Sequence, residues 1–246
     1  MFKKKIKLEE TQINLISDIN PDSLEDFIIS KRNELKNYIS SHHNFFSSYE
    51  PVYIECDEES DIIKLMVEAS EIANVGPMAA VAGTTSQLAI EELVRNGSKF
   101  SVVNNGGDIS FINKNRKMVC GIYAGNSSIS SELGFEFRPQ KSPLGLCTSS
   151  GTVGYSFSYG KGDSVSVIAK KASVADAIAT AIGNDVTGKT DEIAVENGLN
   201  SAVKFEEHII GILIILGDSI ATFGKLPKLI SLEKEENLKF KEDTII

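Results

Sequence analysis

Apolar residues recur along the chain with helical spacing in several segments. Faces built from residues three or four apart predict helices starting near Asn20-Pro21-Asp22, and over residues 58–73, 84–95, 174–183 and 191–197. The first of these helices starts with a capping Asn, Pro at its first position and an acid in its first turn. The chain therefore contains helices that each bury one face.

Shorter apolar or alternating runs predict strands, and these dominate the middle of the chain. They cover an opening strand or hairpin over 3–17, single strands at 51–56, 99–103, 109–112, 117–124, 133–138 and 144–148, two strands within 156–169, and a final hairpin of 209–216 with 219–225. The strands do not alternate regularly with helices. This order predicts an α+β fold, a mainly antiparallel sheet with packed helices, rather than a doubly wound sheet.

No linker, low-complexity segment or repeat divides the sequence, so one domain over residues 1–246 is expected, with a charged tail from about residue 231. Its 246 residues, 41% hydrophobic and 24% charged, permit a core of ordinary size. The net charge of -9 argues against nucleic acid as a partner, because that binding requires clustered Lys and Arg. Small phosphorylated ligands remain compatible, since backbone amides or a divalent cation can hold them.

Targeting and redox features point to the cytoplasm. Acidic residues interrupt what would be the apolar core of a signal peptide, and the most apolar run, 209–216, is too short to span a membrane. Cys56, Cys120 and Cys147 show no paired spacing, which favours a reducing compartment without a disulfide framework. The expectation is a cytoplasmic protein with no membrane partner.

The run Asn104-Asn105-Gly106-Gly107-Asp108 joins two of the predicted strands. Asn-Gly is a strong signal for a tight hairpin turn. Glycine also lets a backbone approach a ligand closely, while Asn and Asp supply short polar groups. The run predicts either a plain turn or one wall of a pocket, and the other motifs favour the pocket.

Two further segments are rich in small residues or hydroxyl groups. Residues 76–85 predict either close packing of a helix on a sheet or a backbone that meets a ligand. Residues 147–156 predict either a polar strand and turn or a cradle for phosphate or sugar hydroxyls. This second segment lacks the Gly-Lys-Ser/Thr ending of a P-loop and the Gly-x-Ser-x-Gly of a hydrolase elbow.

Asp176 and Thr180 lie four residues apart in a predicted helix whose other residues there are Ala and Ile. On a helix they share one face. A carboxylate and a hydroxyl are costly to bury without partners, and Mg²⁺ would offset that cost because it takes oxygen ligands. The alternative is an Asp that points to solvent while the alanines pack.

Four motifs in order resemble the ApbE superfamily: Gly-Pro-Met-Ala-Ala-Val-Ala-Gly, Asn-Gly-Gly-Asp-Ile, Cys-Thr-Ser-Ser-Gly-Thr and Ala-Asp-Ala-Ile-Ala-Thr-Ala. The founding enzymes of that superfamily are FAD:protein FMN transferases. The chain is more similar to a smaller, soluble branch found in archaea and anaerobic bacteria. The resemblance covers about residues 20–220 and implies an ApbE-like α+β fold with a flavin dinucleotide site.

The resemblance also implies roles for individual residues. Mg²⁺ would be held by Asp176, Thr180 and the backbone carbonyl of about Ala82, and Asp176 and Tyr155 are the candidate catalytic residues. The expected contacts to FAD or FMN are Met78, Ala79, Asn105, Gly106, Gly107, Asp108, Thr148, Ser149, Ser150, Gly151 and Thr152.

The sequence departs from the family pattern at a histidine. The transferases carry a His-x-Ile-Asp-Pro-x-Thr-Gly segment after their Thr-Ser-Gly run, whereas no His lies between Tyr155 and Val165. The smaller branch usually has Gly-His-Ser where this chain has Gly154-Tyr155-Ser156. A tyrosine exchanges protons poorly at neutral pH in place of a histidine.

Two functional hypotheses follow. The first is a protein that binds a flavin or related nucleotide with Mg²⁺ and catalyses flavinyl or phosphoryl transfer or pyrophosphate cleavage. The second is a non-catalytic factor with a protein partner in sulfide assimilation into homocysteine, to which the resembling branch is linked; Cys147 beside the hydroxyl run motivates it, although a small buried residue is the simpler interpretation. An antiparallel sheet with short edges can also pair into a homodimer.

Overall fold

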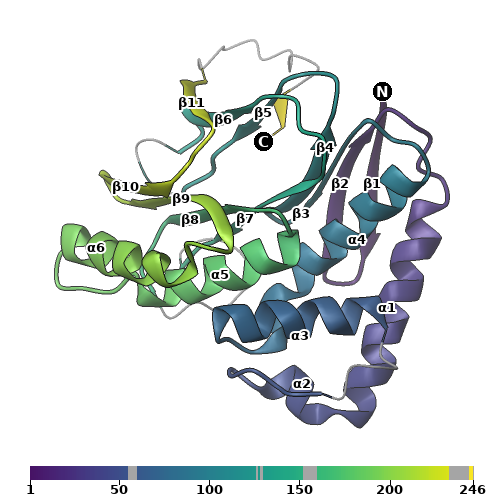
Figure 1. Ribbon diagram of the computed structural model, residues 1–246, viewed down its shortest axis with the longest axis horizontal. Helices are drawn as coiled ribbons and strands as arrows, with labels where there is room; N and C mark the ends of the chain where they lie inside the picture. Colours follow the sequence, from purple (N-terminus) through teal and green to yellow (C-terminus); the bar gives the residue numbers. More distant parts are fainter. Residues whose placement is uncertain (55–59, 126, 128–129, 152–159, 233–243, 246) are drawn as a thin grey trace.

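Two sheets lie face to face, and a layer of helices covers the outer face of the larger one (Figure 1). The computed structural model describes residues 1–54, 60–125, 127, 130–151, 160–232 and 244–245. Of the sheets' strand pairs, all are antiparallel except the pairing of β5 with β12. The predicted α+β class with a mainly antiparallel sheet is confirmed.

The larger sheet has eight strands. In spatial order they are β1 (Phe2–Leu8), β2 (Thr11–Ser17), β3 (Phe100–Asn105), β4 (Asp108–Asn113), β7 (Leu144–Ser149), β8 (Ser164–Ala169), β9 (Ile209–Leu216) and β10 (Ser219–Gly224). The smaller sheet has the order β11 (Lys228–Ser231), β6 (Leu133–Phe137), β5 (Met118–Gly121) and β12 (Thr244–Ile245).

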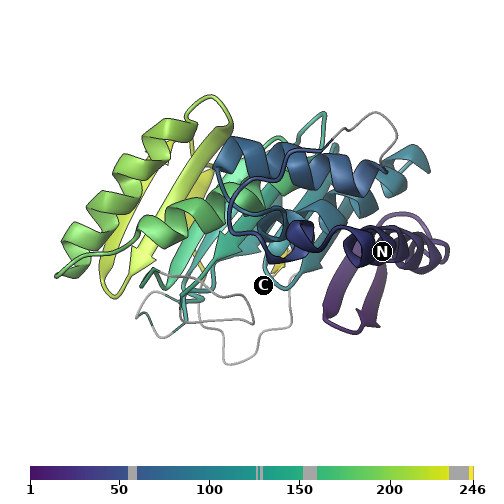
Figure 2. The same cartoon turned by 90° about the horizontal axis from the view of Figure 1, so that it is seen from below.

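The helices lie on the face of the larger sheet that points away from the smaller sheet (Figures 1 and 2). They are α1 (Leu24–Ser41), α2 (His43–Ser47), α3 (Asp61–Ala73), η2 (Pro77–Ala80), α4 (Val81–Arg95), α5 (Ala172–Asp185), α6 (Asp191–Ala202) and η3 (Val203–Phe205). Figure 2 shows α6 over the end of the sheet that contains β9 and β10, and α1 beside the β1–β2 hairpin at the other end.

Both faces of the larger sheet are buried, and strand alternation divides its side chains between two cores. On β9, Ile212 and Ile214 pack toward the helices, whereas Leu213 and Ile215 pack toward the smaller sheet. This explains why the run Ile209–Leu216 is apolar without alternating. A third cluster fills the space between the β1–β2 hairpin, α1 and α4.

Most expected elements form, and the exceptions have physical reasons. Residues 51–54 form no strand, because Pro51 offers no amide hydrogen and this segment lies with α2 on the far side of α3 from either sheet (Figure 1). The expected second strand before 164 is not seen over 160–163, and residues 156–159 lie outside the described part of the chain. Strands β11 and β12, helix α2 and the short helix η3 were not expected. The predicted helix start at Asn20-Pro21-Asp22 is wrong, because α1 begins at Leu24 with Ser23 as its N-cap residue.

The small-residue segment also differs from expectation, since it is already helical before Thr84. Pro77 stands in the first turn of η2, where its missing N–H costs nothing, and α4 begins directly afterwards at Val81 instead of at Thr84. The N–H groups at the start of α4 that reach Asp176 are those of Ala82 and Gly83, because the N–H of Val81 donates to the carbonyl of Met78. None of the helices in the described ranges has the length and apolar character that crossing a bilayer requires.

The contact between the two sheets yields a stability prediction. Phe111 on β4 is fully buried, and its ring meets that of Phe137 edge-on with centroids 4.7 Å apart. Phe111→Ala is expected to lower the free energy of unfolding by about 3–5 kcal/mol, because it removes buried area and leaves a cavity. Denaturant unfolding measures the loss. Tyr53→Ala, at a residue 84% exposed, is the control, and an equal effect of both changes would contradict this packing.

Candidate functional site

The N-terminal ends of α4 and α5 cross in close contact beneath the larger sheet. The backbone N–H of Gly83 in α4 donates to Oδ2 of Asp176 in α5 at 2.8 Å. A Cβ on Gly83 would lie 2.4 Å from the carbonyl oxygen of Ala172 and 2.6 Å from Cβ of Asp176. Only glycine fits this approach, so the small residue here brings a carboxylate onto the free N–H groups of a helix start.

The contact is reciprocal, because α4 also caps α5. Oε1 of Gln87 accepts hydrogen bonds from the backbone N–H of Ser173 at 3.2 Å and from its hydroxyl at 3.0 Å. Neither helix has a capping side chain of its own at the preceding residue. Each helix therefore satisfies orphan donors of the other, which fixes their relative position.

The Asn-Gly-Gly-Asp run forms the hairpin between β3 and β4, with Asn105 paired to Asp108. Gly106 and Gly107 have φ of +70° and +113°, the positive values that a type I′ turn requires at both central positions. An added Cβ on either would meet open space, so backbone conformation rather than packing calls for glycine there. The hairpin interpretation of this run is right for its backbone.

The two residues flanking the glycines contact α4. Nδ2 of Asn105 donates to the carbonyl of Ala82 at 3.4 Å, and the hydroxyl of Ser86 donates to the carbonyl of Asp108 at 2.7 Å. The hairpin, the start of α4 and Asp176 of α5 thus form one cluster. The turn therefore lies against the start of α4, and its role as a wall of a pocket stays a prediction.

Two carboxyl groups share this buried cluster. Burial raises the pKa of Asp108 to about 7, against a smaller lowering by the Thr148 backbone N–H and the Cys147 thiol. Burial, and then the charge of Asp108, raise the pKa of Asp176 well above its usual range, although the N–H groups of Gly83 and Ala82 oppose the rise. Without a bound cation, at least one of these two carboxyl groups is therefore expected to keep its proton.

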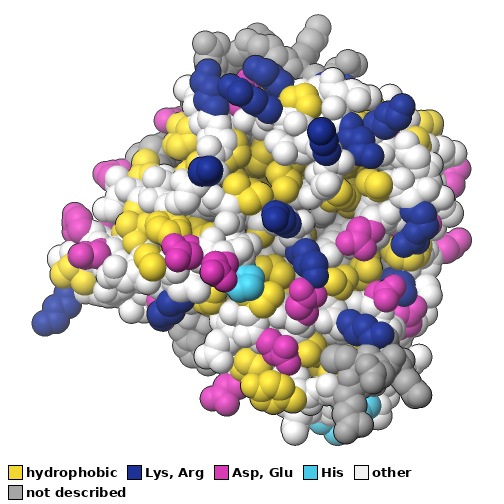
Figure 3. Space-filling model, in the orientation of Figure 1, with side chains coloured by type: hydrophobic (Ala, Val, Ile, Leu, Met, Phe, Trp, Pro, Cys, Tyr) yellow, Lys and Arg dark blue, Asp and Glu magenta, His cyan; other side chains and the backbone are white. Residues whose placement is uncertain are grey.

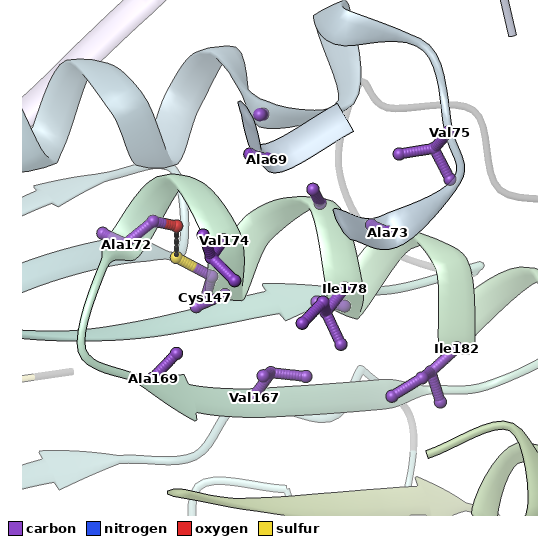
Figure 4. Close-up of a cluster of buried hydrophobic side chains, with 14 of the residues drawn as sticks. Ala69, Ala73, Val75, Cys147, Val167, Ala169, Ala172, Val174, Ile178 and Ile182 are labelled. Atoms are coloured by element: carbon purple, nitrogen blue, oxygen red, sulfur yellow. Dashed lines mark hydrogen bonds between the residues drawn. The ribbon is translucent and has the colours of Figure 1, made fainter. Parts of the chain in front are cut away.

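Cys147 lies under α5 beside the carboxyl groups. Its thiol is fully buried and donates to the carbonyl of Ala172 at 3.3 Å (Figure 4). Burial and the neighbouring charges of Asp108 and Asp176 raise the pKa of this thiol well above its ordinary value. A neutral, enclosed thiol is a poor nucleophile, so the interpretation as a small core residue is supported. Cys120 is buried and unpaired as well.

The structure brings several expected site residues together and separates others. Asn105, Asp108, Asp176 and Ala82 meet in the cluster, and Thr180 lies half-buried one helical turn beyond Asp176. The remaining expected positions are half-buried Met78 and Ala79 in η2, the turn glycines Gly106 and Gly107, and Ser149, Ser150 and Gly151 at the end of β7.

The backbone N–H of Thr148 reaches Asp108, but β-strand alternation turns the Thr148 side chain to the opposite face of the sheet from Asp176. Its hydroxyl bonds that of Ser166 at 3.0 Å, whereas Cys147 and Ser149 share the helix-facing side. Thr152 and Tyr155 lie outside the described residues.

Sequence reasoning did not single out Gly83, Ser86 or Gln87 as individual site residues. Gly83 and Ser86 are three apart and Gly83 and Gln87 four apart, so all three share one helical face. This spacing becomes visible only if the helix is extended back to Val81. The many small residues before Thr84 hid the true start of the helix.

The oxygen atoms offered by the expected metal ligands suit a hard cation. Asp176, Thr180 and the carbonyl of Ala82 offer oxygen ligands, and Mg²⁺ favours such ligands while keeping several waters. Two buried oxygens nearby, Oδ1 of Asp108 and Oγ1 of Thr84, have no hydrogen-bond partner among the described residues. Within the described ranges no three His, Cys, Asp or Glu side chains are arranged so that they could hold a metal ion, so such an ion would depend on hydroxyl, carbonyl and ligand oxygens.

A cavity of about 260 Å³ lies elsewhere, at the C-terminal end of α4. Its lining includes Pro21, Leu24 and Glu92. It is remote from the carboxyl cluster, which lies at the other end of the same helix, and it contains none of the groups with displaced pKa values. The chemistry therefore points to the N-terminal end of α4.

Comparison with known proteins identifies the family of this chain. A family model described as "AbpE bacteria" matches residues 2–218. The chain belongs to this ApbE-like family. A UPF0280 protein of Methanobrevibacter smithii is 44% identical over 234 residues, covering 95% of this chain and 98% of the relative. A UPF0280 protein of Methanococcus maripaludis is 45% identical over 242 residues, with 96% of each chain covered.

Solved structures show the same ApbE-like fold at low sequence identity. The flavin transferase ApbE from Vibrio cholerae has a TM-score of 0.56 at 14% identity, covering 90% of this chain and 96% of its own. The Pseudomonas stutzeri flavinyl transferase ApbE in its apo form has a TM-score of 0.57 at 13% identity, covering 90% and 93%. The predicted ApbE-like fold is confirmed.

The buried carboxyl group of Asp108 predicts how stability depends on pH. Its pKa is about 7 when folded and 3.8 when unfolded, so the folded chain holds a proton that the unfolded chain releases. In a metal chelator, stability is expected to be highest near pH 4 and to fall by on the order of 3 kcal/mol as pH rises to about 7. Asp108→Asn should make this decline smaller, leaving the part caused by the raised pKa of Asp176, and should stabilise the protein at pH 8.

Denaturant unfolding at a series of pH values measures this dependence. Asp185→Asn, an exposed position at the C-terminal end of α5, is the control and should keep the wild-type profile. A decline that is unchanged in Asp108→Asn would contradict the assignment.

Proposed function

We propose that this chain binds a flavin nucleotide together with a divalent cation at the Asp176 site, and transfers the flavinyl phosphate to an acceptor hydroxyl. The observation that carries the proposal is the pair of buried carboxyl groups, Asp108 and Asp176, at the N-terminal end of α4. A fold that served stability alone would gain from apolar residues there, since buried unpaired carboxylates are costly.

The proposed ligands of the cation are Asp176, Thr180 and the carbonyl of Ala82. Asp176 is positioned by its hydrogen bond from Gly83, and the Ala82 carbonyl by its contact with Asn105. When bound, the cation would draw negative charge from a pyrophosphate and so favour departure of the nucleoside monophosphate. Asp108 would accept a ligand or water hydrogen bond at its unpartnered oxygen.

The backbone around the site suits a nucleotide. The Asn105–Asp108 turn presents glycines with open space at their Cβ positions, and η2 places Met78 and Ala79 half-buried before α4. Glycine backbone and helix starts are common supports for phosphates. The names of the Vibrio and Pseudomonas structures, flavin and flavinyl transferase, support flavin as the nucleotide.

The alternative of a sulfur-carrying factor lacks support at its motivating residue. Cys147 is enclosed, hydrogen-bonded and has a raised pKa, which opposes a role as a sulfur carrier. A scaffold role would leave nucleotide binding without turnover, and the two experiments below separate these outcomes.

The metal assignment predicts linked binding of cation and flavin. Asp176→Asn keeps an acceptor for Gly83 but removes the charge, and it is expected to weaken Mg²⁺-dependent FAD binding by at least about tenfold in calorimetry. Asp185→Asn on the same helix is the matched control and should bind as the wild type does. Tight FAD binding that ignores both Mg²⁺ and Asp176→Asn would exclude this assignment.

Turnover is tested separately by product analysis. Wild-type protein with FAD, Mg²⁺ and a Ser- or Thr-containing acceptor peptide is expected to release AMP and increase the peptide mass by one FMN moiety. Asp176→Asn should slow this by about 100-fold, since loss of metal-assisted charge stabilisation costs several kcal/mol. Binding without AMP release would favour the non-catalytic factor.

A further inference from the structure

The two edge strands of the larger sheet differ in chemistry. Strand β1 carries Lys3, Lys4, Lys5 and Lys7, and lysines on an edge discourage pairing with another chain. Strand β10, at the opposite end of the sheet, reads Ser-Ile-Ala-Thr-Phe-Gly and has no charge or proline. Figure 3 shows hydrophobic side chains on the surface between the positions of β10 and α6.

The register of the β9–β10 hairpin decides which groups of β10 point outward. The two-residue turn at Gly217 and Asp218 makes Leu216 and Ser219 a hydrogen-bonded pair, so Ser219, Ala221 and Phe223 bond to β9. The backbone N–H and C=O groups of Ile220 and Thr222 therefore face away from the sheet. Both residues are exposed, Ile220 by 47%.

We propose that β10 pairs with β10 of a second copy of this chain, joining the two larger sheets across a two-fold axis. In antiparallel pairing centred on Ala221, the outward groups of Ile220 bond to those of Thr222 of the second copy, and symmetry repeats the pair. The free edge is thus complementary to itself in hydrogen bonding, as an isologous interface requires.

Charge favours the same arrangement. With the axis at Ala221, Gly217 at the turn lies opposite Lys225 of the second copy. Oδ2 of Asp191, the first residue of α6, is 3.0 Å from the Cβ position of Gly217. Lys225 is exposed just beyond β10, so each turn presents an acid where the other chain presents a base.

The proposed interface leaves the Asp176 site open. Strands β8 and β9 separate β10 from β7, whose helix-facing side adjoins the carboxyl cluster. Substitutions on β10 should therefore change the oligomeric state without changing nucleotide binding per chain. This separates the test from that of the proposed function.

The experiment is sedimentation velocity of the full chain at concentrations up to about 0.1 mM. The wild type is expected at twice 26.7 kDa. Ile220→Lys should weaken the dimer at least about tenfold, because it places a charge on the pairing edge. Leu229→Lys is the matched control at a 37% exposed residue of β11, and it should remain dimeric.

A charge exchange tests the register. Lys225→Glu should weaken the dimer, and adding Asp191→Lys in the same chain should restore it, whereas Lys228→Glu on β11 should have no effect. Circular dichroism melting confirms that each variant is folded. A monomeric wild type, or a dimer that Leu229→Lys disrupts and Ile220→Lys does not, would overturn the proposal.

Discussion

The reciprocal capping of α4 and α5 is the interaction on which the rest of the site depends. Asp176 accepts from the start of α4, Gln87 accepts from the start of α5, and the absence of a side chain at Gly83 allows the approach. Neither helix has a side-chain cap of its own, so each depends on the other. Their crossing places a carboxylate of one helix beside the β3–β4 hairpin, which reaches the same point through Asn105.

This arrangement is electrostatically demanding. Asp108 and Asp176 raise each other's cost of ionisation and that of the Cys147 thiol, in surroundings that burial has already made unfavourable for charge. Backbone N–H groups of Ala82 and Gly83 offset part of that cost for Asp176. Buried carboxyl groups with raised pKa values, positioned by well-packed helices, are typical of sites that bind ions or ligands.

The sequence predicted the strands and turns whose formation depends on residues close together in the chain. The apolar run Ile209–Leu216 and the Asn-Gly-Gly-Asp turn formed as expected, because period and turn chemistry act within a few residues. Tertiary context decided the rest. No neighbouring strand receives residues 51–54, and strand alternation turns Thr148 away from Asp176 although the two motifs suggested one pocket. The N–H of Gly83 in the first turn of α4 is bonded to a carboxylate 93 residues away in the sequence, that of Asp176.

That long sequence separation couples the site to the whole fold. The hydrogen bond between Gly83 and Asp176 exists only when the sheet, α4 and α5 are assembled, so the unfolded chain has no cluster of carboxyl groups that could hold a cation or share a proton. A ligand that binds only the assembled site stabilises the fold by mass action. Cation binding and protonation relieve the same repulsion, because each compensates the charge of Asp108 and Asp176. Protonation and the proposed cation therefore compete, and the proposed cation should bind most tightly above the pH at which these carboxyl groups lose their protons.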